Sequence, residues 1–299
     1  MGTIARHELA AAVSESGGLG TLGGVNSPIG AELAAARRLT GRPIAVNLLL
    51  PFVGRGEVAA AAAADVIVTF WGEPRRLAAN TWIHQCGSVK EAKAAAAAGA
   101  DAVIAQGVEA GGHVRGITPM LELLERVRAA VKIPVLAAGG IVDAEGVRVS
   151  LTAGAIAAVV GTRFLLSDES HAHPGYKQRC IESTETVVTD LFGLGWPDAP
   201  HRVIPNRATR RWLRGDSHGP GWVQAVNRIT APLAIRIPTA LQKAAIKAQR
   251  PSQPFLAPQP PTDDGPVSLL DAGPLYAGMN VGRITDVRPA AALVKALTP

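Results

Sequence analysis

The sequence has few cysteines and no long apolar run. Its 299 residues include two cysteines, Cys86 and Cys180, which are too few for a disulfide framework or a thiolate metal cluster and which suit the reducing cytoplasm. The alanine-rich runs are short and interrupted by charge, so we expect no membrane span. Residues 1–8 lack a basic start followed by an apolar core, so no signal peptide is visible.

Several functional signatures are also absent. The chain has no Walker loop and no Ser-His-Asp set with a nucleophile elbow. His171 and His173 stand near an expected helix start without clustered carboxylates or thiolates, so no metal site is predicted. The net charge is +6, but the basic residues are scattered. They are densest over 202–214 and lack the interleaved aromatics of single-strand binders, which argues against a nucleic-acid partner.

What is present is a globular composition with a repeated pattern. Hydrophobic residues make up 47% of the chain and charged residues 18%, and the length allows one barrel plus an appended region. In the first half, helices that end in a small residue and a glycine precede short apolar runs, as over 98–107 and 153–162. The glycine is typical of a left-handed helix cap, and the apolar run is typical of a parallel strand buried on both faces.

This pattern predicts alternating helices and strands. Expected helices cover 7–16, 29–39, 57–64, 88–98, 120–131 and 143–153, with a short helical turn at 75–79. Expected strands cover 19–22, 44–49, 66–70, 81–85, 102–105, 135–138 and 157–160. In the helix over 120–131, Leu121, Leu124 and Val127 should share the apolar face. Strict alternation indicates a parallel sheet with right-handed crossovers.

These strands predict an α/β fold of the TIM (βα)8 type that lacks its first strand. The chain begins on a helix, so we expect strand 1 to lie upstream of Met1 in the natural protein; an open sheet is the alternative. The barrel should occupy residues 1–166. A helical and loop lid region should follow over 167–267, and the segment 268–299 should return to the barrel.

The expected lid region has its own local signals. Pro174 should open a helix that runs to about Glu182. Residues 191–204, rich in Gly, Pro and Trp, should form an ordered loop. Residues 222–248 should form one or two helices broken near Pro232 and Pro238. The proline-rich segment 251–265 should be an extended linker or flexible loop, and a final helix should cover 290–297.

The long stretch 106–119 carries the most distinctive chemistry. It joins a strand to a helix and contains His113. Long loops in compact domains are usually functional. Its glycines let backbone approach a flat or charged ligand; they are Gly107, Gly111, Gly112 and Gly116. The alternative is a glycine-rich turn with a histidine on its surface.

Other strand ends point to a phosphorylated ligand. In a parallel barrel, loops after strands seven and eight form a recurring phosphate site. The residues exposed there are Gly139, Gly140, Gly161 and Thr162. Asn47 and Gln106 are strand amides that could bond the edge of a ring such as a flavin's. His84 and Gln85 are also expected to point toward the mouth. The alternatives are glycines that only end strands and amides satisfied within the core.

These motifs together resemble the nitronate monooxygenase family, once called 2-nitropropane dioxygenases. The resemblance rests on Gln-Gly-Val-Glu-Ala-Gly-Gly-His at 106–113, Ala-Ala-Gly-Gly-Ile at 137–141 and Gly-Thr-Arg-Phe at 161–164. Support comes from Val-Asn-Leu at 46–48 and Tyr-Ala-Gly at 276–278. The resemblance covers residues 1 to about 206 and 274–297.

The resemblance implies an FMN-binding TIM barrel with a helical lid. FMN would be held by Asn47, Gln106, Gly111, Gly139, Gly140, Gly161 and Thr162. His113 would remove, or hydrogen-bond, the acidic proton next to a nitro group. The flavin would then oxidise the nitronate and O2 would re-oxidise the flavin. The implied partners are a small nitronate or nitroalkane and O2, with a second copy of the chain as a possible partner.

Two other functions fit the same residues. An FMN- and NADH-dependent enoyl-ACP reductase of the same superfamily shares the stretch at 109–113. An inactive flavin-binding protein is the other alternative, because family members begin with a strand that ends in Ala-Pro-Met, of which Met1-Gly2 looks like a remnant.

Overall fold

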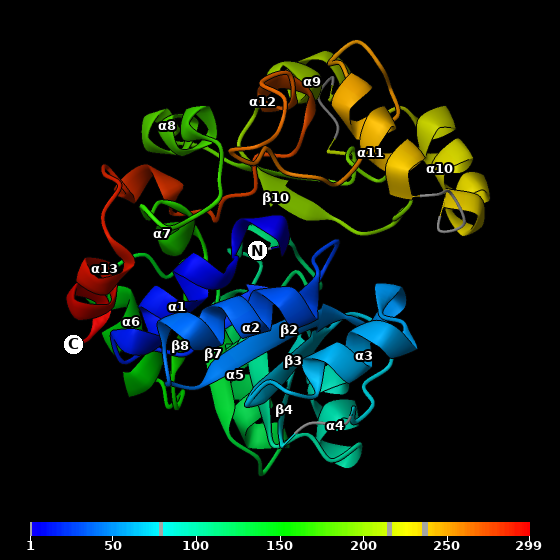
Figure 1. The fold of residues 1–299 in the computed structure, drawn as a ribbon. Coiled ribbons are helices and arrows are strands. Elements are labelled where there is room, and N and C mark those ends of the chain that lie inside the picture. The colour runs from blue at the N-terminus through cyan, green and yellow to red at the C-terminus, as the bar shows by residue number, and fades with distance from the viewer. Residues whose placement is uncertain (1, 78–79, 214–216, 235–238) are drawn as a thin grey trace. The chain divides into compact units, whose positions relative to one another are not determined.

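The computed structural model describes residues 2–77, 80–213, 217–234 and 239–299. Its contacts divide the chain into two compact units (Figure 1). The first unit comprises Met1–Ala110, Arg115–His171 and Asp286–Pro299. The second unit comprises Gly111–Val114 and Ala172–Thr285.

The first unit is built on a curled, seven-stranded parallel sheet in the order β1-β2-β3-β4-β5-β7-β8. The strands are β1 Gly20–Gly23, β2 Ile44–Leu49, β3 Val66–Phe70, β4 Thr81–Cys86, β5 Ala102–Gln106, β7 Val135–Ala138 and β8 Ala158–Val159. Adjacent strands of this sheet occur in the same order along the chain, with only β6 of the second unit between β5 and β7. The predicted α/β fold with seven parallel barrel strands is confirmed.

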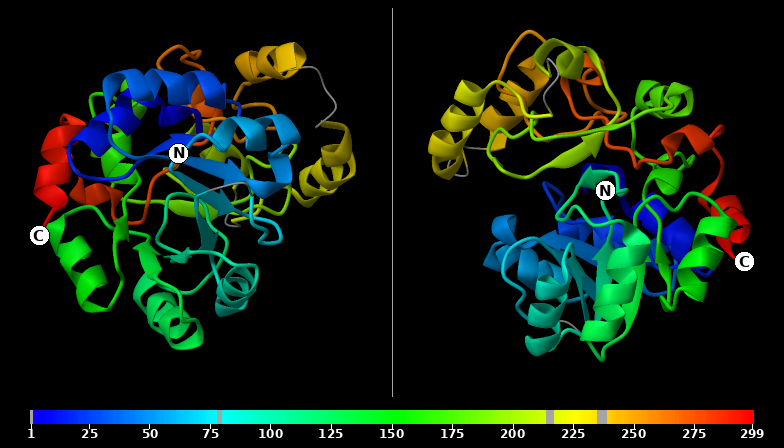
Figure 2. Two further views of the ribbon diagram at one scale, coloured as in Figure 1. Left: turned by 60° about the horizontal axis from the view of Figure 1, so that its bottom comes forward. Right: turned by 180° about the vertical axis from the view of Figure 1, so that it is seen from behind.

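Helices flank this sheet (Figures 1 and 2). They are α1 His7–Glu15, α2 Ile29–Leu39, α3 Arg55–Ala61, α4 Val89–Ala97, α5 Met120–Ala130, α6 Ala144–Thr152, α7 Thr162–Leu165 and α13 Ala290–Leu297. Two 3-10 turns, η1 Gly2–Ile4 and η2 Leu50–Phe52, complete the unit. Helix starts follow their capping signals: the Ser88 hydroxyl accepts from the Glu91 N–H, and the Asp143 carboxylate accepts from the Gly146 N–H.

Two local predictions in this unit need correction. Residues 75–77 are not helical, and 78–79 lie outside the described residues. In α5 the buried face begins at Met120 and continues through Leu123, Leu124 and Val127, whereas Leu121 is 43% exposed. The apolar face therefore starts one residue earlier than predicted, and the 100° step per residue turns Leu121 to solvent.

Side chains of the sheet alternate between two layers. The inner layer is Ala45, Val68, Ile83, Ala102, Ile104 and Ala138. The outer layer packs against the helices in two clusters, one containing Val46, Leu48 and Ile67 and the other containing Trp82, Cys86, Val103 and Ala105. This alternation decides which polar strand residues face the interior of the curled sheet.

The second unit contains a small antiparallel sheet in the order β6-β10-β9. Its strands are β6 Gly112–His113, β9 Val187–Thr189 and β10 His201–Val203. Its helices are α8 Pro174–Glu182, α9 Arg207–Trp212, α10 Gly221–Ala234, α11 Thr239–Ala248 and α12 Leu269–Ala272, with the 3-10 turn η3 Val281–Arg283. No helix among the described residues is long and apolar enough to cross a bilayer.

The second unit departs from three sequence expectations. The loop predicted over 191–204 ends in β10, and the loop over 106–119 contains β6. Both strands are too short to show a period, and each forms only by pairing with a distant segment. The one or two helices expected over 222–248 are present as α10 and α11, but the helix is not interrupted at Pro232 itself, because α10 continues to Ala234. Pro238 lies outside the described residues. Residues 251–265 form no helix, as predicted, but they are not a free linker, because Leu256 is fully buried in a cluster with Leu191 and Phe192.

Candidate active site

His113 lies in an aromatic cluster of the second unit. Its imidazole stacks on the indole of Trp196, with ring centroids 4.0 Å apart and planes inclined by 24°. The rings of His201 and Tyr276 follow at 5.2 and 5.6 Å. We call His113, Trp196, His201 and Tyr276 the aromatic cluster. His113 is half-buried, so it is not simply a surface histidine on a turn.

The glycines before His113 let the backbone reach this position. Gly112 has φ +77°, a left-handed conformation that favours glycine. A Cβ on Gly111 would lie 2.6 Å from the carbonyl carbon of Ala277, so no side chain fits there. On the other side of His113, the Val114 N–H donates to the Pro200 carbonyl at 2.8 Å. Gly111 therefore has a packing reason of its own, in addition to the predicted role at FMN.

His201 was not predicted as a site residue. It is fully buried opposite His113 in the β6–β10 ladder. Its Nδ1 lies 3.0 Å from the Ala199 carbonyl, which can only accept, so Nδ1 carries the proton and Nε2 is an acceptor. Within the described residues this Nε2 has no hydrogen-bond partner. Burial lowers the pKa of His201 to about 4, so the ring is neutral at physiological pH.

The electrostatics of His113 favour an uncharged imidazole. Surrounding protein, and secondarily the neighbouring His201, lower the pKa of His113 well below its usual 6.5. A neutral imidazole can accept a proton or donate a hydrogen bond, which are the two roles expected of a base next to an acidic C–H group.

In the first unit, the polar strand residues predicted to contact a ring share the inner face. Asn47 and Gln106 each lie two residues after an inner-layer residue, Ala45 and Ile104 respectively. Gln106 is buried, and its Oε1 accepts from the Arg115 N–H at 3.3 Å. Asn47 is half-buried. By the same alternation Gln85 follows Ile83 on this face.

The glycine-bearing strand ends also lie together. Gln106 of β5 pairs with Ala138 of β7, which pairs with Val159 of β8. The residues that follow these strands are therefore neighbours at one edge of the sheet, namely Gly107, Gly139, Gly140, Gly161 and Thr162. Gly139 and Gly140 have φ +128° and +69°, which a side chain would strain. Around Gly161 a Cβ would meet nothing within 4 Å, so the space beside its Cα is unoccupied.

His84 does not point toward the mouth, contrary to the prediction. It lies between Ile83 and Gln85 and therefore belongs to the outer layer with Trp82. Its Nδ1 is 2.8 Å from the Thr69 hydroxyl, which accepts from the Trp82 indole at 2.7 Å. Burial lowers the pKa of His84 to about 4. His84 is a buried structural residue in an outer hydrogen-bond network.

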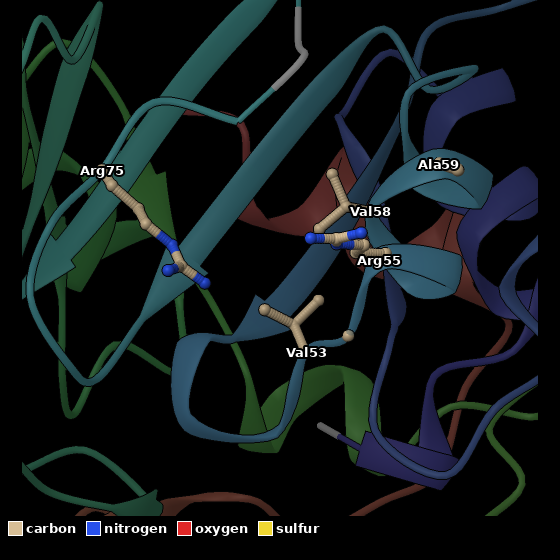
Figure 3. Close-up of a pocket in the computed structure, with 6 residues that line it drawn as sticks. Val53, Arg55, Val58, Ala59 and Arg75 are labelled. Carbon is tan, nitrogen blue, oxygen red and sulfur yellow. The ribbon is translucent and has the colours of Figure 1, made fainter.

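Two depressions in the first unit are lined by none of the predicted site residues. One, of about 480 Å³, is lined by Val53, Gly54, Arg55, Val58, Ala59 and Arg75. Figure 3 shows the side chains of Arg55 and Arg75 extending toward each other across it. The other, of about 430 Å³, is lined by Gly72, Glu73, Pro74, Ser88, Lys90, Glu91, Ala94 and Arg115. Within the described residues, no three His, Cys, Asp or Glu side chains are grouped as metal ligands.

Among curated proteins, a relative from Mycobacterium tuberculosis is 32% identical over 245 residues. It is named (3aS,4S,5R,7aS)-5-hydroxy-7a-methyl-1-oxo-octahydro-1H-indene-4-carboxyl-CoA dehydrogenase, and the match covers 76% of this chain and 67% of that protein. The chain spans less than two thirds of several other curated relatives that it matches.

Two solved structures share the fold over almost the whole chain. FabK from Thermotoga maritima has a TM-score of 0.75 and 27% identity, with 99% of this chain and 89% of that chain covered. A nitroalkane oxidase from Streptomyces ansochromogenes has a TM-score of 0.74 and 29% identity, covering 99% and 92%. The family model described as nitronate monooxygenase matches residues 1–86 and 75–299. The chain belongs to the nitronate monooxygenase family of flavin-dependent oxidoreductases.

Proposed function

We propose that this protein uses FMN and O2 to oxidise alkyl nitronates or nitroalkanes, with His113 contacting the nitro-bearing carbon or the nitronate. The observation that carries the proposal is the neutral imidazole of His113, presented on a glycine-rich segment within the aromatic cluster. The family match over the chain and the likeness to a nitroalkane oxidase support it.

The residues present fit FMN. Its phosphate needs backbone N–H groups without obstructing side chains, and Gly139, Gly140 and Gly161 offer such backbone beside Thr162. Its ring needs amide donors and acceptors, which Asn47 and Gln106 would supply from the inner face. Gly111 would let the segment before His113 approach the ring closely. When bound, FMN supplies the redox chemistry that side chains cannot perform.

For a neutral nitroalkane, His113 would accept the proton from the carbon that bears the nitro group. Burial keeps the imidazole unprotonated at neutral pH, so it is ready to accept. The proton would then rest on the ring beside Trp196, whose π face favours a nearby cation. For a nitronate, already deprotonated, His113 would act only as a hydrogen-bond donor.

Reduction of an enoyl thioester is the second candidate. It is favoured by the likeness to FabK, and the Mycobacterium tuberculosis relative is also named for a CoA compound. Such a reaction would need NADH as the electron source, and His113 would orient the thioester.

The test begins with the absorption spectrum of the purified chain, in which bound FMN gives flavin bands. Oxygen uptake with propionate 3-nitronate is then compared with NADH oxidation by a crotonyl thioester. Oxygen uptake without NADH supports the nitronate function. NADH oxidation with the thioester, without oxygen uptake with the nitronate, would show that the protein reduces enoyl thioesters instead. A flavin-loaded protein inactive in both assays would reject both.

A further inference from the structure

The segment that carries His113 is held at its start by backbone contacts of the first unit. The Gly107 N–H donates to the Ala138 carbonyl at 2.9 Å, and the Val108 N–H donates to the Thr118 carbonyl at 3.0 Å. The Glu109 carboxylate accepts from the N–H of Met120, the first residue of α5, at 3.0 Å. These contacts all hold residues before His113. After His113, Arg115 is a residue whose side chain contacts other parts of the first unit.

Arg115 contacts residues that follow or end three neighbouring strands of the first unit. Its Nε donates to Glu91 Oε1 at 2.5 Å, and its guanidinium lies over the Trp71 ring, 4.6 Å from the centroid. Its backbone N–H donates to Gln106 Oε1 at 3.3 Å. Trp71 follows β3, Glu91 lies in the helix after β4, and Gln106 ends β5. The side chain and the backbone N–H of Arg115 therefore connect the regions at the carboxyl ends of β3, β4 and β5.

Both side-chain partners of Arg115 are themselves fixed. Glu91 Oε2 accepts from the Gly87 N–H at 2.8 Å, so its carboxylate is anchored to the turn after β4. Trp71 is buried and packs edge-on against Phe70. Its φ of +60° is rare for a bulky residue. Strained backbone of this kind persists only where the surroundings impose it, and it clusters at functional sites.

The backbone beside Arg115 is also in close contact with the turn after β4. A Cβ on Gly116 would lie 2.1 Å from the Gly87 carbonyl oxygen, and a Cβ on Gly87 would lie 2.5 Å from the Gly116 N. Two glycines therefore face each other where the His113 segment crosses the turn after β4. This contact allows the Arg115 guanidinium to reach both Trp71 and Glu91.

The N–H of Arg115 has a consequence for Gln106. Because Gln106 Oε1 accepts this bond, the NH2 end of the same amide is turned away from Arg115. Gln106 lies on the inner face, where the proposed function places the ring of FMN. An amide oriented this way offers a donor to an acceptor at the ring edge.

We propose that Arg115 is a positioning residue of the site. Held by Glu91 and Trp71, its guanidinium fixes the backbone after His113, and its N–H orients the amide of Gln106 as a hydrogen-bond donor toward the ligand. The effects on catalysis and on FMN binding rest on the proposed function, whereas the effect on the segment does not.

The test compares Arg115→Ala, Arg115→Lys and Glu91→Gln with the wild-type chain. Arg148→Ala is the matched control, since Arg148 also pairs with a glutamate, Glu145, but on the exposed face of α6. Hydrogen exchange of the peptide over 107–119 measures the segment directly. FMN affinity is measured by quenching of flavin fluorescence. Together with the flavin absorption spectrum, it reports whether the amide of Gln106 keeps its orientation.

Arg115→Ala should speed exchange over 107–119, shift the flavin spectrum and weaken FMN binding by about tenfold. It should lower kcat with propionate 3-nitronate by about 10- to 100-fold with little change in KM, since a misplacement of about 1 Å can have that effect. Glu91→Gln should act in the same direction. Arg115→Lys keeps the charge but not the planar fork, and it should recover only part of the loss.

Exchange and FMN affinity of Arg115→Ala equal to those of Arg148→Ala would overturn the proposal. A full recovery by Arg115→Lys would overturn the role given to stacking on Trp71. A wild-type chain without nitronate turnover would reject the proposed function alone, because hydrogen exchange over 107–119 would still decide whether Arg115 positions the segment.

Discussion

The imidazole of His113 lies flat against the indole of Trp196, with centroids 4.0 Å apart. The two residues are far apart in sequence, and they meet because β6 pairs with β10 through His113 and His201. Stacking restricts the imidazole to one plane and leaves its ring nitrogens at the edge. This geometry suits a group that must meet a substrate proton from a fixed direction.

Replacing His113 by Asn should remove the base without removing flavin. We expect His113→Asn to bind FMN like the wild type and to lose about 10²- to 10⁴-fold in kcat/KM for a neutral nitroalkane. Turnover of a pre-formed nitronate should fall less, because no proton has to be removed. Oxygen uptake with each substrate measures the two effects. His173→Asn is the control, since His173 caps α8 through its side chain and asparagine is also a good cap. Unchanged nitroalkane turnover would remove His113 from the mechanism.

Trp196 should act through the orientation of His113. An aromatic pair contributes about 0.5–1.5 kcal/mol beyond its buried area, so Trp196→Ala should lower kcat/KM by about tenfold, whereas Trp196→Phe, which keeps a stacking surface, should retain most activity. Steady-state oxygen uptake compares the two variants. Equal losses in both would mean that stacking is not what orients the imidazole.

His201 should shift the acid limb of the pH profile. Burial is the main cause that lowers the pKa of His113, and repulsion between a charged His201 and a charged His113 lowers it further. Removal of His201 should therefore raise the pKa of His113. Catalysis by a base needs neutral His113, so the fall in kcat/KM on acidification should begin at higher pH in His201→Phe and His201→Gln than in the wild type. Trp196→Phe removes no titratable group and should leave the limb in place. A limb that does not move in either His201 variant would contradict this electrostatic link.

The barrel could be predicted because its signals are local. The helix Ile29–Leu39 and the strands Ile44–Leu49 and Val66–Phe70 coincide with the predicted ranges. They could be predicted because the spacing of apolar residues and the glycines at helix ends lie within or next to each segment. The same local signals predict the strand ends that carry Gly139, Gly140 and Gly161.

The remaining features depend on contacts between distant segments. Strands β6, β9 and β10 are two or three residues long, so they show no period, and the pairing of His113 with His201 was not predictable from either stretch alone. His201, Trp196 and Arg115 therefore lacked a local signal of their role. The direction of His84 is an exception, because it follows from alternation along β4: a residue next to the inner Ile83 must face outward and not toward the mouth.

His84 should make stability depend on pH. Burial lowers its pKa from 6.5 to about 4 in the folded chain, so the unfolded chain binds the proton more readily. The contribution of neutral His84 to the free energy of unfolding is complete above pH 6.5 and is lost as pH falls toward 4. We expect the free energy of unfolding to fall over this window by up to about 3 kcal/mol on account of His84, and His84→Gln to show a smaller fall. Thr69→Val, which removes the hydroxyl bonded to His84 but keeps the imidazole, should instead lose stability at every pH and retain the slope. Urea unfolding at pH 4.5, 5.5 and 7 separates these cases, and parallel curves for wild type and His84→Gln would show that His84 is not the group that titrates.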